Sequence, residues 1–292
     1  MRILFIGTVI FSKNILEEIL KSQNKIVGVI GKKKSKFNSD YCDLVKYSKN
    51  KKIDTIYSNN VNAIKVLQWV KKKKPDIIFC IGWNQLLKEK ILKIAPKGII
   101  GYHPSDLPKN RGRHPIIWSL VLGLKKIGSC FFYMDNKADA GNIISKKMIK
   151  IDKKSDSKSI YKNLINVGTK QVREILLKLK KNKVKSLKQR NLESNYWRKR
   201  SEVDGKIDWR MDAQSIDNLV KALTKPYPGA YFLFNEKKIT VWKSKVIDLN
   251  KKNFEPGKII KFNKNLIIKC GNKALKLISF EPKINLKRVT YL

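Results

Sequence analysis

The sequence predicts an α/β protein in which a doubly wound, mostly parallel β-sheet is followed by a small β-barrel. Short apolar runs alternate with helical patterns over roughly the first 150 residues, as in a parallel sheet with crossover helices. The run DIIFCIG (76–82) is apolar almost throughout, which a central parallel strand covered on both faces requires. After about residue 200, short strands separated by Gly and Asn turns indicate the barrel.

The elements of the sheet follow from this alternation. Strands are expected at residues 2–9, 25–31, 55–57, 76–82 and 98–104, and helices at 12–21, 41–50, 62–73 and 114–123. Ser12 is expected to cap the first helix, and Ile64, Leu67 and Val70 are expected to face inward from the third. Pro115 suits the first turn of the last of these helices.

The later elements complete the first domain and form the second. An antiparallel pair is expected at 127–135 and 142–151, and then a long helix from Ser155, its expected cap, to about Lys183. A lysine-rich run (178–190) leads out of the domain. A helix at Ala213–Leu223 and strands at 230–234, 238–247, 257–262, 265–270 and 274–280 suggest an OB-like barrel. The expected division is an α/β domain at 1–185, a linker at 186–205 and the β-barrel domain at 206–292.

The net charge of +42 is the strongest compositional feature, with 65 Lys and Arg against 23 Asp and Glu. Such an excess attracts phosphate in nucleic acids, nucleotides or anionic lipids. The excess is nearly all lysine and is spread along the chain beside abundant Ile and Asn, as an AT-biased coding sequence would produce. Surfaces dedicated to nucleic acid usually show clusters and more arginine, so compositional bias is the favoured explanation.

Cysteine usage and apolar runs indicate a reducing, cytoplasmic compartment. None of the four cysteines forms a CxxC pair and the chain has only two histidines, so no metal site is expected. Cys80 and Cys130 lie in apolar runs and are expected to be buried free thiols. The apolar start, MRILFIGTVIF, is interpreted as a strand, and no apolar run approaches the roughly 18 residues of a membrane helix.

A segment dense in functional residue types, GYHPSDLPKNRGRHPIIW (101–118), runs from a strand into a helix. Its His103 ends a strand, and ligands of open α/β sheets bind at the carboxyl ends of strands. Arg111 and Arg113 flank Gly112, and their guanidinium groups can grip phosphate or carboxylate beside the following helix. From the residues alone, the histidine is equally consistent with a structural hydrogen-bonding group, and the arginines with a surface turn.

A second segment, DNKADAGNI (135–143), joins the two strands of the expected antiparallel pair. Its Asp139 precedes Ala140 and Gly141, and an Asp in such a turn is usually only a turn former. A carboxylate beside an imidazole would orient the ring and raise its basicity. A catalytic role for Asp139 therefore depends on its meeting His103 in space.

Six segments together resemble the formyl-tetrahydrofolate-dependent formyltransferases. They are MRILFIGT (1–8), HPSDLPKNRGRHPIIW (103–118), MDNKADAGNI (134–143), DGKIDW (204–209), NLVKALTKPYPGAYF (218–232) and ITVWKSKV (239–246). The resemblance thus covers almost the whole chain. The family includes enzymes that act on methionyl-tRNA, on glycinamide ribonucleotide and on amino sugars linked to UDP or dTDP. DGKIDW and PYPGA match the carboxy-terminal β-domain of the tRNA and sugar branches.

The resemblance implies N10-formyltetrahydrofolate as co-substrate. His103 and Asp139 match the family's histidine and aspartate, which assist attack of a neutral amine on the formyl carbonyl and typically contribute ~10²–10⁴ each in rate. The folate is expected to contact Ile81, Gly82, Trp83, Leu86, Leu87, Asp135 and Gly141. The amine substrate is expected to contact Ser105, Arg111 and Arg113.

The sequence departs from the family pattern at Gly101. The family commonly has Asn two residues before the histidine, and loss of one such oxyanion donor can cost ~3 kcal/mol. Asn110 and Asn84 are the candidate replacements. The alternatives are a mechanism that relies on His103 and backbone amides, or a weakened activity. The intact LPKNRGRHP loop favours a pocket that is still used.

The acceptor amine is expected to belong to a nucleotide-linked amino sugar rather than to a tRNA. Residues 31–57 lack the longer Arg- and Gly-rich insertion of the tRNA enzymes, and SKFNSDYCDL (35–44) resembles the branch that serves surface polysaccharides. The basic composition and the β-domain keep methionyl-tRNA formyltransferase as the alternative. A non-enzymatic polyanion-binding protein also remains open, as does a formate-releasing hydrolase, although that branch usually carries an amino-terminal regulatory domain. A homodimer without membrane partners is expected.

Overall fold

The computed structural model describes residues 1–34, 39–249, 253–261, 266–283 and 291–292. They form two compact units. The first comprises Met1–Pro115, Ile127–Ile149 and Lys162–Trp197, and the second comprises Ile116–Lys126, Lys150–Tyr161 and Arg198–Leu292. The first contains a mostly parallel sheet with helices and the second a curled antiparallel sheet, so the predicted fold class is confirmed.

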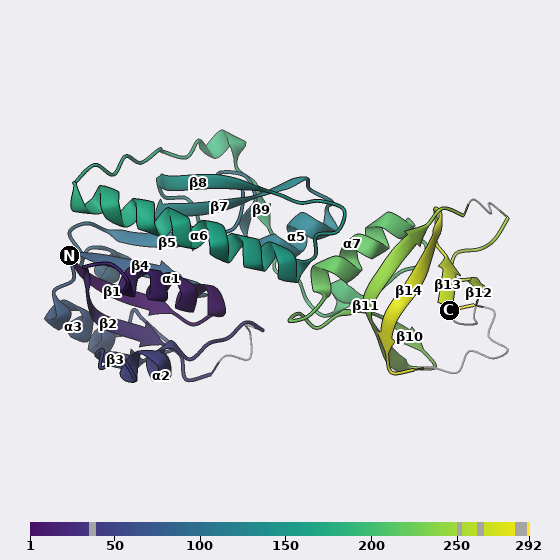
Figure 1. Ribbon diagram of the computed structural model, residues 1–292, viewed down its shortest axis with the longest axis horizontal. Coiled ribbons are helices and arrows are strands. Elements are labelled where there is room, and N and C mark those ends of the chain that lie inside the picture. Colours follow the sequence, from purple (N-terminus) through teal and green to yellow (C-terminus); the bar gives the residue numbers. More distant parts are fainter. Residues whose placement is uncertain (35–38, 250–252, 262–265, 284–290) are drawn as a thin grey trace. The chain divides into compact units, whose positions relative to one another are not determined.

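The sheet of the first unit has seven strands in the order β3-β2-β1-β4-β5-β7-β8 (Figure 1). They are β1 (Arg2–Gly7), β2 (Lys25–Gly31), β3 (Thr55–Tyr57), β4 (Ile77–Ile81), β5 (Ile99–His103), β7 (Lys126–Tyr133) and β8 (Ile143–Lys150). Strands β1 to β5 are parallel, and β7 pairs antiparallel with β5. The order reverses between β1 and β4, which is where open α/β sheets bind ligands.

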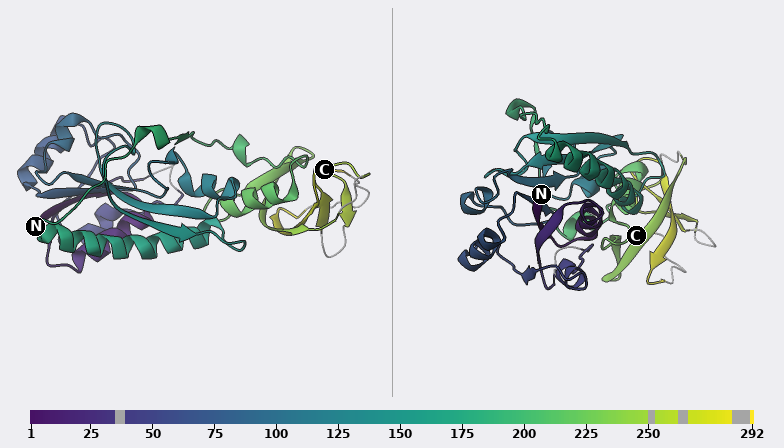
Figure 2. Two further views of the ribbon diagram at one scale, coloured as in Figure 1. Left: turned by 90° about the horizontal axis from the view of Figure 1, so that it is seen from above. Right: turned by 60° about the vertical axis from the view of Figure 1, so that its left-hand side comes forward.

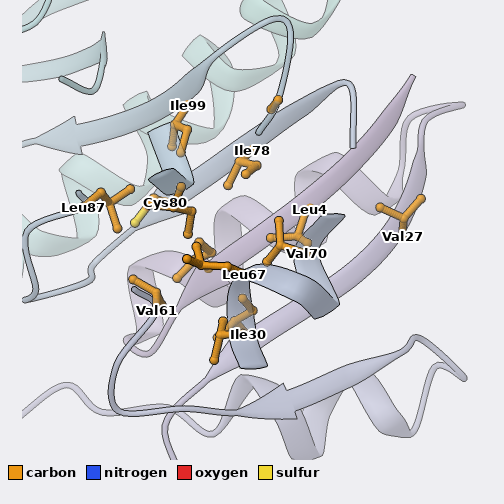
Figure 3. Packing of buried hydrophobic residues seen from close by; sticks show 14 residues of the cluster. Leu4, Val27, Ile30, Val61, Leu67, Val70, Ile78, Cys80, Leu87 and Ile99 are labelled. Atoms are coloured by element: carbon orange, nitrogen blue, oxygen red, sulfur yellow. The ribbon is translucent and has the colours of Figure 1, made fainter. Parts of the chain in front are cut away.

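Helices cover both faces of this sheet. They are α1 (Ile10–Leu20), α2 (Leu44–Lys49), α3 (Ile64–Lys73), α4 (Glu89–Leu92) and α6 (Ser157–Lys180). Because side chains alternate along a strand, Leu4 and Ile78 point to one face, where they pack with Leu67 and Val70 of α3 and Ile91 of α4 (Figure 3). The alternate positions of β1 and β4 are equally buried against the other face, which explains why β4 is wholly apolar and β1 is apolar after Arg2.

On that other face, α1 and α6 lie side by side (Figures 1 and 2). The Phe11 ring of α1 stacks on Tyr102 of β5 with a centroid distance of 4.2 Å. Gly168 lets α6 approach, because a Cβ atom there would lie 2.7 Å from Cζ of Phe11. An ion pair at 2.8 Å between Arg173 of α6 and Glu18 of α1 supports the same contact.

The buried cysteines are unpaired and chemically inert. Cys80 and Cys130 are free thiols inside the core, as predicted, and Cys270 is a third. Burial raises the pKa of all three thiols to about 12, far above the pH at which a thiolate would form in cells. Within the described ranges, no cluster of His, Cys, Asp or Glu could hold a metal ion.

The second unit packs α7 (Ala213–Leu223) on a sheet of order β10-β11-β14-β13-β12. The strands are β10 (Ala230–Phe234), β11 (Lys237–Ile247), β12 (Ile259–Lys261), β13 (Leu266–Lys269) and β14 (Ala274–Glu281), and they pair antiparallel into a half-barrel. The Asp212 carboxylate caps α7 by accepting from the Ser215 N–H at 3.0 Å. The helix and β10 have the predicted bounds, and each of the other four strands agrees with its prediction to within one or two residues at its described ends. The predicted residues 262 and 265 lie outside the described residues.

Three expectations for individual side chains are wrong. Ser12 is the third residue of α1, which begins at Ile10, and so is not its N-cap. Its hydroxyl accepts from the N–H of the N-cap residue Val9 at 3.4 Å and donates to Ile81 of β4. Ile64 is 68% exposed in the first turn of α3, because Val66, Leu67 and Val70 define the buried face. Ser155 pairs with Asp152, and the carboxylate that accepts from the N–H of Ser159 at the start of α6 is Asp156.

Several short elements complete the fold, and all of them except α5 carry no clear pattern in the sequence. Besides α4, they are α5 (Pro115–Val121, within the predicted 114–123), β6 (Arg111–Gly112), β9 (Tyr196–Trp197), and the 3₁₀ turns at Asn191–Glu193 and Val203–Gly205. β6 pairs in parallel with β9 outside the main sheet. Residues 35–38 of the segment SKFNSDYCDL (35–44) lie outside the described residues.

Among the helices of the described ranges, none combines the length and the apolar character that a membrane-spanning helix needs.

Replacing Gly168 by Val should destabilise the first unit through the contact of α1 with α6. The new side chain would meet the Phe11 ring, which is stacked on Tyr102, and the strain should cost about 1–3 kcal/mol. Urea unfolding followed by circular dichroism measures this loss. Lys170→Val, at an exposed position of the same helix, is the matched control and should cost less than ~0.7 kcal/mol in helix propensity. Equal losses in the two variants would contradict the packing argument.

Candidate active site

The site lies at the carboxyl ends of β4 and β5. These strands pair in parallel with Cys80 opposite Gly101, so the residues after each strand emerge at one edge of the sheet. Gly82 turns the chain there with a φ of +64°, a conformation that favours glycine. The Ser12 hydroxyl donates to the carbonyl oxygen of Ile81 at 2.6 Å and holds this turn against α1.

His103 and Asp139 meet at this edge. The Nδ1 atom of His103 lies 3.6 Å from Oδ1 of Asp139, and the two side chains are 8% and 20% exposed. Both residues border the same cavity. The distance slightly exceeds that of a hydrogen bond, as is common for catalytic contacts before the substrate binds. His103 and Asp139 are distant in the sequence, and the structure therefore brings their side chains together.

The second ring nitrogen of His103 determines how the pair can work. Its Nε2 atom lies 3.2 Å from the backbone oxygen of Asn110. Because a carbonyl oxygen only accepts, the ring makes this bond as the donor through Nε2–H. Nδ1 is then the nitrogen that can gain and lose a proton, and the Asp139 carboxylate is placed to stabilise the protonated ring. The arrangement is that of a general base with an orienting carboxylate.

The turn that carries Asp139 is held by close backbone contacts. Asp139 has a φ of +56°, which is uncommon for a residue with a side chain. Its Oδ2 atom accepts from the Gly112 N–H at 3.1 Å. Gln189 Nε2 donates to the backbone oxygens of Asp139 at 2.9 Å and Gly141 at 2.7 Å. Only glycine fits at 141, because a Cβ atom would lie 1.7 Å from the oxygen of Tyr133.

A cavity of about 240 Å³ opens beside the pair. The expected site residues that border it are Gly82, Trp83, Leu86, His103, Arg113, Asp135 and Asp139. The rest of its wall is formed by Cys80, Asn84, Gln85, Gly101, Tyr102, Gly112, Phe132, Met134, Lys137 and Ala138. Both charge signs are thus present around a partly apolar interior, as in many small-molecule sites.

Three residues expected to contact folate lie behind this wall. Ile81 and Leu87 are fully buried, and Leu87 belongs to the hydrophobic cluster of α3 and α4. The Gly141 carbonyl is occupied by Gln189. The side chains of Ile81 and Leu87 therefore build the edge of the site, and contact of the three residues with folate, which would use their backbone groups, stays a prediction.

Two residues expected to contact the amine substrate are also enclosed. Ser105 is 1% exposed and its hydroxyl donates to the Lys109 carbonyl at 3.2 Å. Arg111 is 2% exposed, and its Nη2 and Nη1 atoms donate to Gln189 Oε1 at 2.8 Å and to the Tyr196 hydroxyl at 3.1 Å. The protein itself uses the hydrogen-bonding groups of both side chains, and their expected contact with the substrate stays a prediction. Arg113 is exposed and borders the cavity.

Side chains of β7 and of the residue that follows it fill the position of the family asparagine. A Cβ atom on Gly101 would lie 2.8 Å from Cγ of Met134 and 3.1 Å from Cζ of Phe132. Both residues border the cavity beside Gly101. Met134 therefore takes the space in which an asparagine side chain would begin, and no donor can stand there without repacking.

Lys32, Trp83 and Asn84 form a polar corner in which the latter two border the cavity. Lys32 Nζ donates to Oδ1 of Asn84 at 2.6 Å and lies 4.8 Å from the centre of the Trp83 ring. Burial lowers the pKa of Lys32. Because an ammonium group only donates, this bond identifies the oxygen of the Asn84 amide and directs Nδ2 elsewhere. The buried Nε1–H of Trp83 has no acceptor within the described ranges, so a ligand could supply one.

The sequence did not predict the residues that hold the loop of His103 and the turn of Asp139 together. Gln189, Asn195 and Tyr196 fall in the stretch expected to be a linker, where isolated polar side chains give no periodic signal. Phe132 and Met134 had a usable signal. Phe132 pairs with Gly101, so alternation places it and Met134 on the face that carries His103.

The chain matches two family models in order, Formyl transferase over residues 1–176 and Formyl transferase, C-terminal domain, over residues 199–287. It is 30% identical over 288 residues to the methionyl-tRNA formyltransferase of Caldanaerobacter subterraneus subsp. tengcongensis, covering 97% of this chain and 93% of that protein. It is 40% identical over 239 residues to the bifunctional polymyxin resistance protein ArnA of Wigglesworthia glossinidia brevipalpis. That match covers 82% of this chain, which spans only 36% of the length of ArnA.

A solved structure has the same fold. The N-formyltransferase from Helicobacter canadensis, in complex with folinic acid and dTDP-3-aminofucose, superposes with a TM-score of 0.74 at 21% identity over 96% of this chain and 99% of that one. The first family model alone covers more than half of the sequence, and the relative from Caldanaerobacter aligns almost end to end. The chain therefore belongs to the formyltransferase family.

Proposed function

We propose that this protein transfers the formyl group of N10-formyltetrahydrofolate to the amino group of a nucleotide-linked amino sugar. The observation that carries the proposal is the approach of His103 to Asp139, at 3.6 Å, on the wall of a cavity at the edge of the sheet. Similarity to ArnA, and a common fold with a protein crystallised with folinic acid and a dTDP-amino sugar, support it.

The cavity wall fits a reduced folate. The turn after β4 presents backbone groups at Gly82, the unsatisfied indole N–H of Trp83 and the half-exposed side chain of Leu86. Asp135 adds a carboxylate to the cavity wall. A pterin needs this combination of an apolar slot and a few polar partners. The folate supplies the formyl group, and these residues would hold its ring beside His103.

The transfer itself needs one proton acceptor and one stabilised oxyanion. The amine nitrogen attacks the formyl carbon and a C–N bond forms, while His103 Nδ1 accepts the proton that the nitrogen loses. The Asp139 carboxylate stabilises the imidazolium. When the tetrahedral intermediate collapses, the bond from the formyl carbon to N10 breaks and the imidazolium returns the proton to N10 as tetrahydrofolate leaves.

Asn84 is the best candidate to replace the family's oxyanion donor. Asn84 borders the cavity and its amide is oriented by Lys32. Asn110 is not among the residues that border the cavity. Its contact with His103 is made by its backbone oxygen, not by its amide side chain. The wall at Gly101 is closed by Met134. A donor from the turn after β4 therefore fits better than one from the loop after β5.

The acceptor would approach over Arg113 and Lys137, which are exposed cations at the cavity. Both suit the phosphates of a sugar nucleotide. The proposal includes a cytoplasmic location, a role in surface-polysaccharide synthesis and a homodimer. Methionyl-tRNA is the second candidate acceptor, because the tRNA formyltransferase relative aligns over 97% of the chain and the net charge is +42.

An acceptor panel should separate these candidates. Formyl-tetrahydrofolate is incubated with dTDP- and UDP-linked amino sugars, or with methionyl-tRNA, and tetrahydrofolate release is followed. We expect turnover with an amino-sugar nucleotide and only weak tRNA binding, lost steeply as salt rises because phosphate contacts dominate. Efficient formylation of methionyl-tRNA would replace the first candidate by the second. Absence of both turnover and folate binding would refute formyl transfer.

Asp139→Asn should lower kcat by ~10²–10⁴ while the protein stays folded. The asparagine oxygen can still accept from the Gly112 N–H, but the charge that stabilises the imidazolium is lost. His103→Ala should abolish transfer. Asp106→Asn is the matched control, because Asp106 lies in the loop after β5 and its carboxylate pairs with Lys146, not with the imidazole of His103. Steady-state kinetics measure all three, and near-normal rates for either catalytic variant would remove that residue from the mechanism.

Asn84→Ala should lower kcat by ~10²-fold if its amide holds the oxyanion. Restoring the family asparagine should then compensate, but only when Met134 makes room. We expect Gly101→Asn with Met134→Ala to recover part of the rate lost in Asn84→Ala, whereas Met134→Ala alone should recover none. An Asn84→Ala variant with unchanged kcat would eliminate Asn84 as the donor.

A further inference from the structure

Residues 187–197, here called the clasp segment, bind the loop after β5 and the turn of Asp139 together. Leu187 exchanges two backbone hydrogen bonds of 2.8 Å with Ile143. Asn195 accepts from the Asn110 N–H through Oδ1 at 2.8 Å and from the Arg111 N–H through its backbone oxygen at 3.0 Å. The Trp197 oxygen accepts from the Arg113 N–H at 3.0 Å. The segment therefore belongs to the first unit, although its composition is typical of a linker.

Gln189 lies at the centre of this contact. It is 6% exposed, and its Oε1 atom accepts from Arg111 Nε at 3.2 Å and Nη2 at 2.8 Å. Its Nε2 atom donates to the oxygens of Asp139 and Gly141. Both donors and both acceptor sites of the amide are thus used, so only one orientation of the side chain satisfies its surroundings.

Arg111 gives this network its rigidity. Its guanidinium is almost completely buried, and in the described part of the chain no carboxylate pairs with it. Neutral acceptors, Gln189 and Tyr196, satisfy the charge instead. A buried charge that loses such partners becomes costly, so the loop and the clasp segment are coupled strongly.

The network acts on Asp139 at two points. Gln189 holds its backbone oxygen, and the Gly112 N–H, from the residue after Arg111, holds its carboxylate. Asp139 needs such support because its φ of +56° is strained for a residue other than glycine. We propose that Gln189 is a positioning residue, which fixes the Asp139 turn and thereby the distance from the carboxylate to His103. The inference rests on the proposed catalytic role of Asp139.

Gln189→Glu tests this role without changing the size of the side chain. The glutamate keeps oxygens for Arg111 but loses both donors to the Asp139 turn. A displacement of about 1 Å at a catalytic group can cost ~10²-fold, so we expect kcat to fall ~10–100-fold with the KM of each substrate nearly unchanged. Gln189→Asn, which keeps the amide but shortens it, should give an intermediate loss and serves if the glutamate variant does not fold.

A double-mutant cycle with Asp139→Asn separates positioning from general damage. If Gln189 acts through Asp139, Gln189→Glu should lower kcat by less than ~3-fold in the Asp139→Asn background. Gln171→Glu is the control, because Gln171 is also a buried glutamine, 1% exposed, and bonds Ser129 and Ser145 away from the turn. Its effect on kcat should be the same factor in both backgrounds. Equal factors for Gln189→Glu in both backgrounds, or a wild-type kcat, would overturn the proposal.

Hydrogen exchange gives a readout that does not depend on turnover. The Gly112 amide proton is bonded to Asp139, so Gln189→Glu should speed its exchange by at least ~10-fold, whereas Gln171→Glu should not. Unchanged protection of Gly112 would refute the positioning role even if the enzyme used a different acceptor. Faster exchange in a protein without formyl transfer would leave the positioning intact and reject only the proposed function.

Discussion

The close approach of backbone segments at Gly112 and Gly141 is the constraint on which the site depends. A Cβ atom would lie 2.3 Å from the oxygen of Trp197 at the first position and 1.7 Å from the oxygen of Tyr133 at the second. Without side chains there, three segments distant in sequence come close enough to share hydrogen bonds. The same approach carries the Asp139 carboxylate to the imidazole, so a backbone requirement sets the geometry of the proposed chemistry.

The sequence predicted the parts of the fold that are governed by repeating patterns. The strands β1 and β4 follow from short continuous apolar runs, which burial on both faces requires, and the bounds of α7 follow from its amphipathic helical pattern. Helix caps were less predictable. Ser12 and Ser155 are good capping residues in isolation, but a hydroxyl has several possible partners. Ser12 stands two residues later than the first residue of its helix and bonds both Val9 and Ile81, and Ser155 bonds Asp152. Such choices depend on tertiary contacts that a local pattern does not contain.

In the site, too, the sequence predicted the general arrangement better than the contacts of individual side chains. The motifs around His103 and Asp139 were sufficient to predict that the two side chains meet. His103 ends β5, and Asp139 lies in the connection from β7, which pairs with β5, to β8. The motifs could not show that Arg111 is enclosed. Its burial is produced by the clasp segment, about 80 residues further along, whose polar side chains resemble those of a solvated linker. A motif therefore locates a functional loop more reliably than it assigns a role to each residue in it.

The net charge and the cavity act at different ranges. A charge of +42 favours encounter with any polyanion, but beyond the ~8 Å Debye length of physiological salt its field is largely screened and does not distinguish acceptors. Around the cavity, Arg113 and Lys137 are balanced by Asp135 and Asp139. A volume of about 240 Å³ is below the ~300–1,000 Å³ of typical small-molecule pockets, so it holds the reacting centre rather than a whole acceptor. Under the proposed function, the nucleotide or tRNA part of the acceptor would then bind outside the cavity, where the exposed side chain of Arg113 can reach it and the buried side chain of His103 cannot.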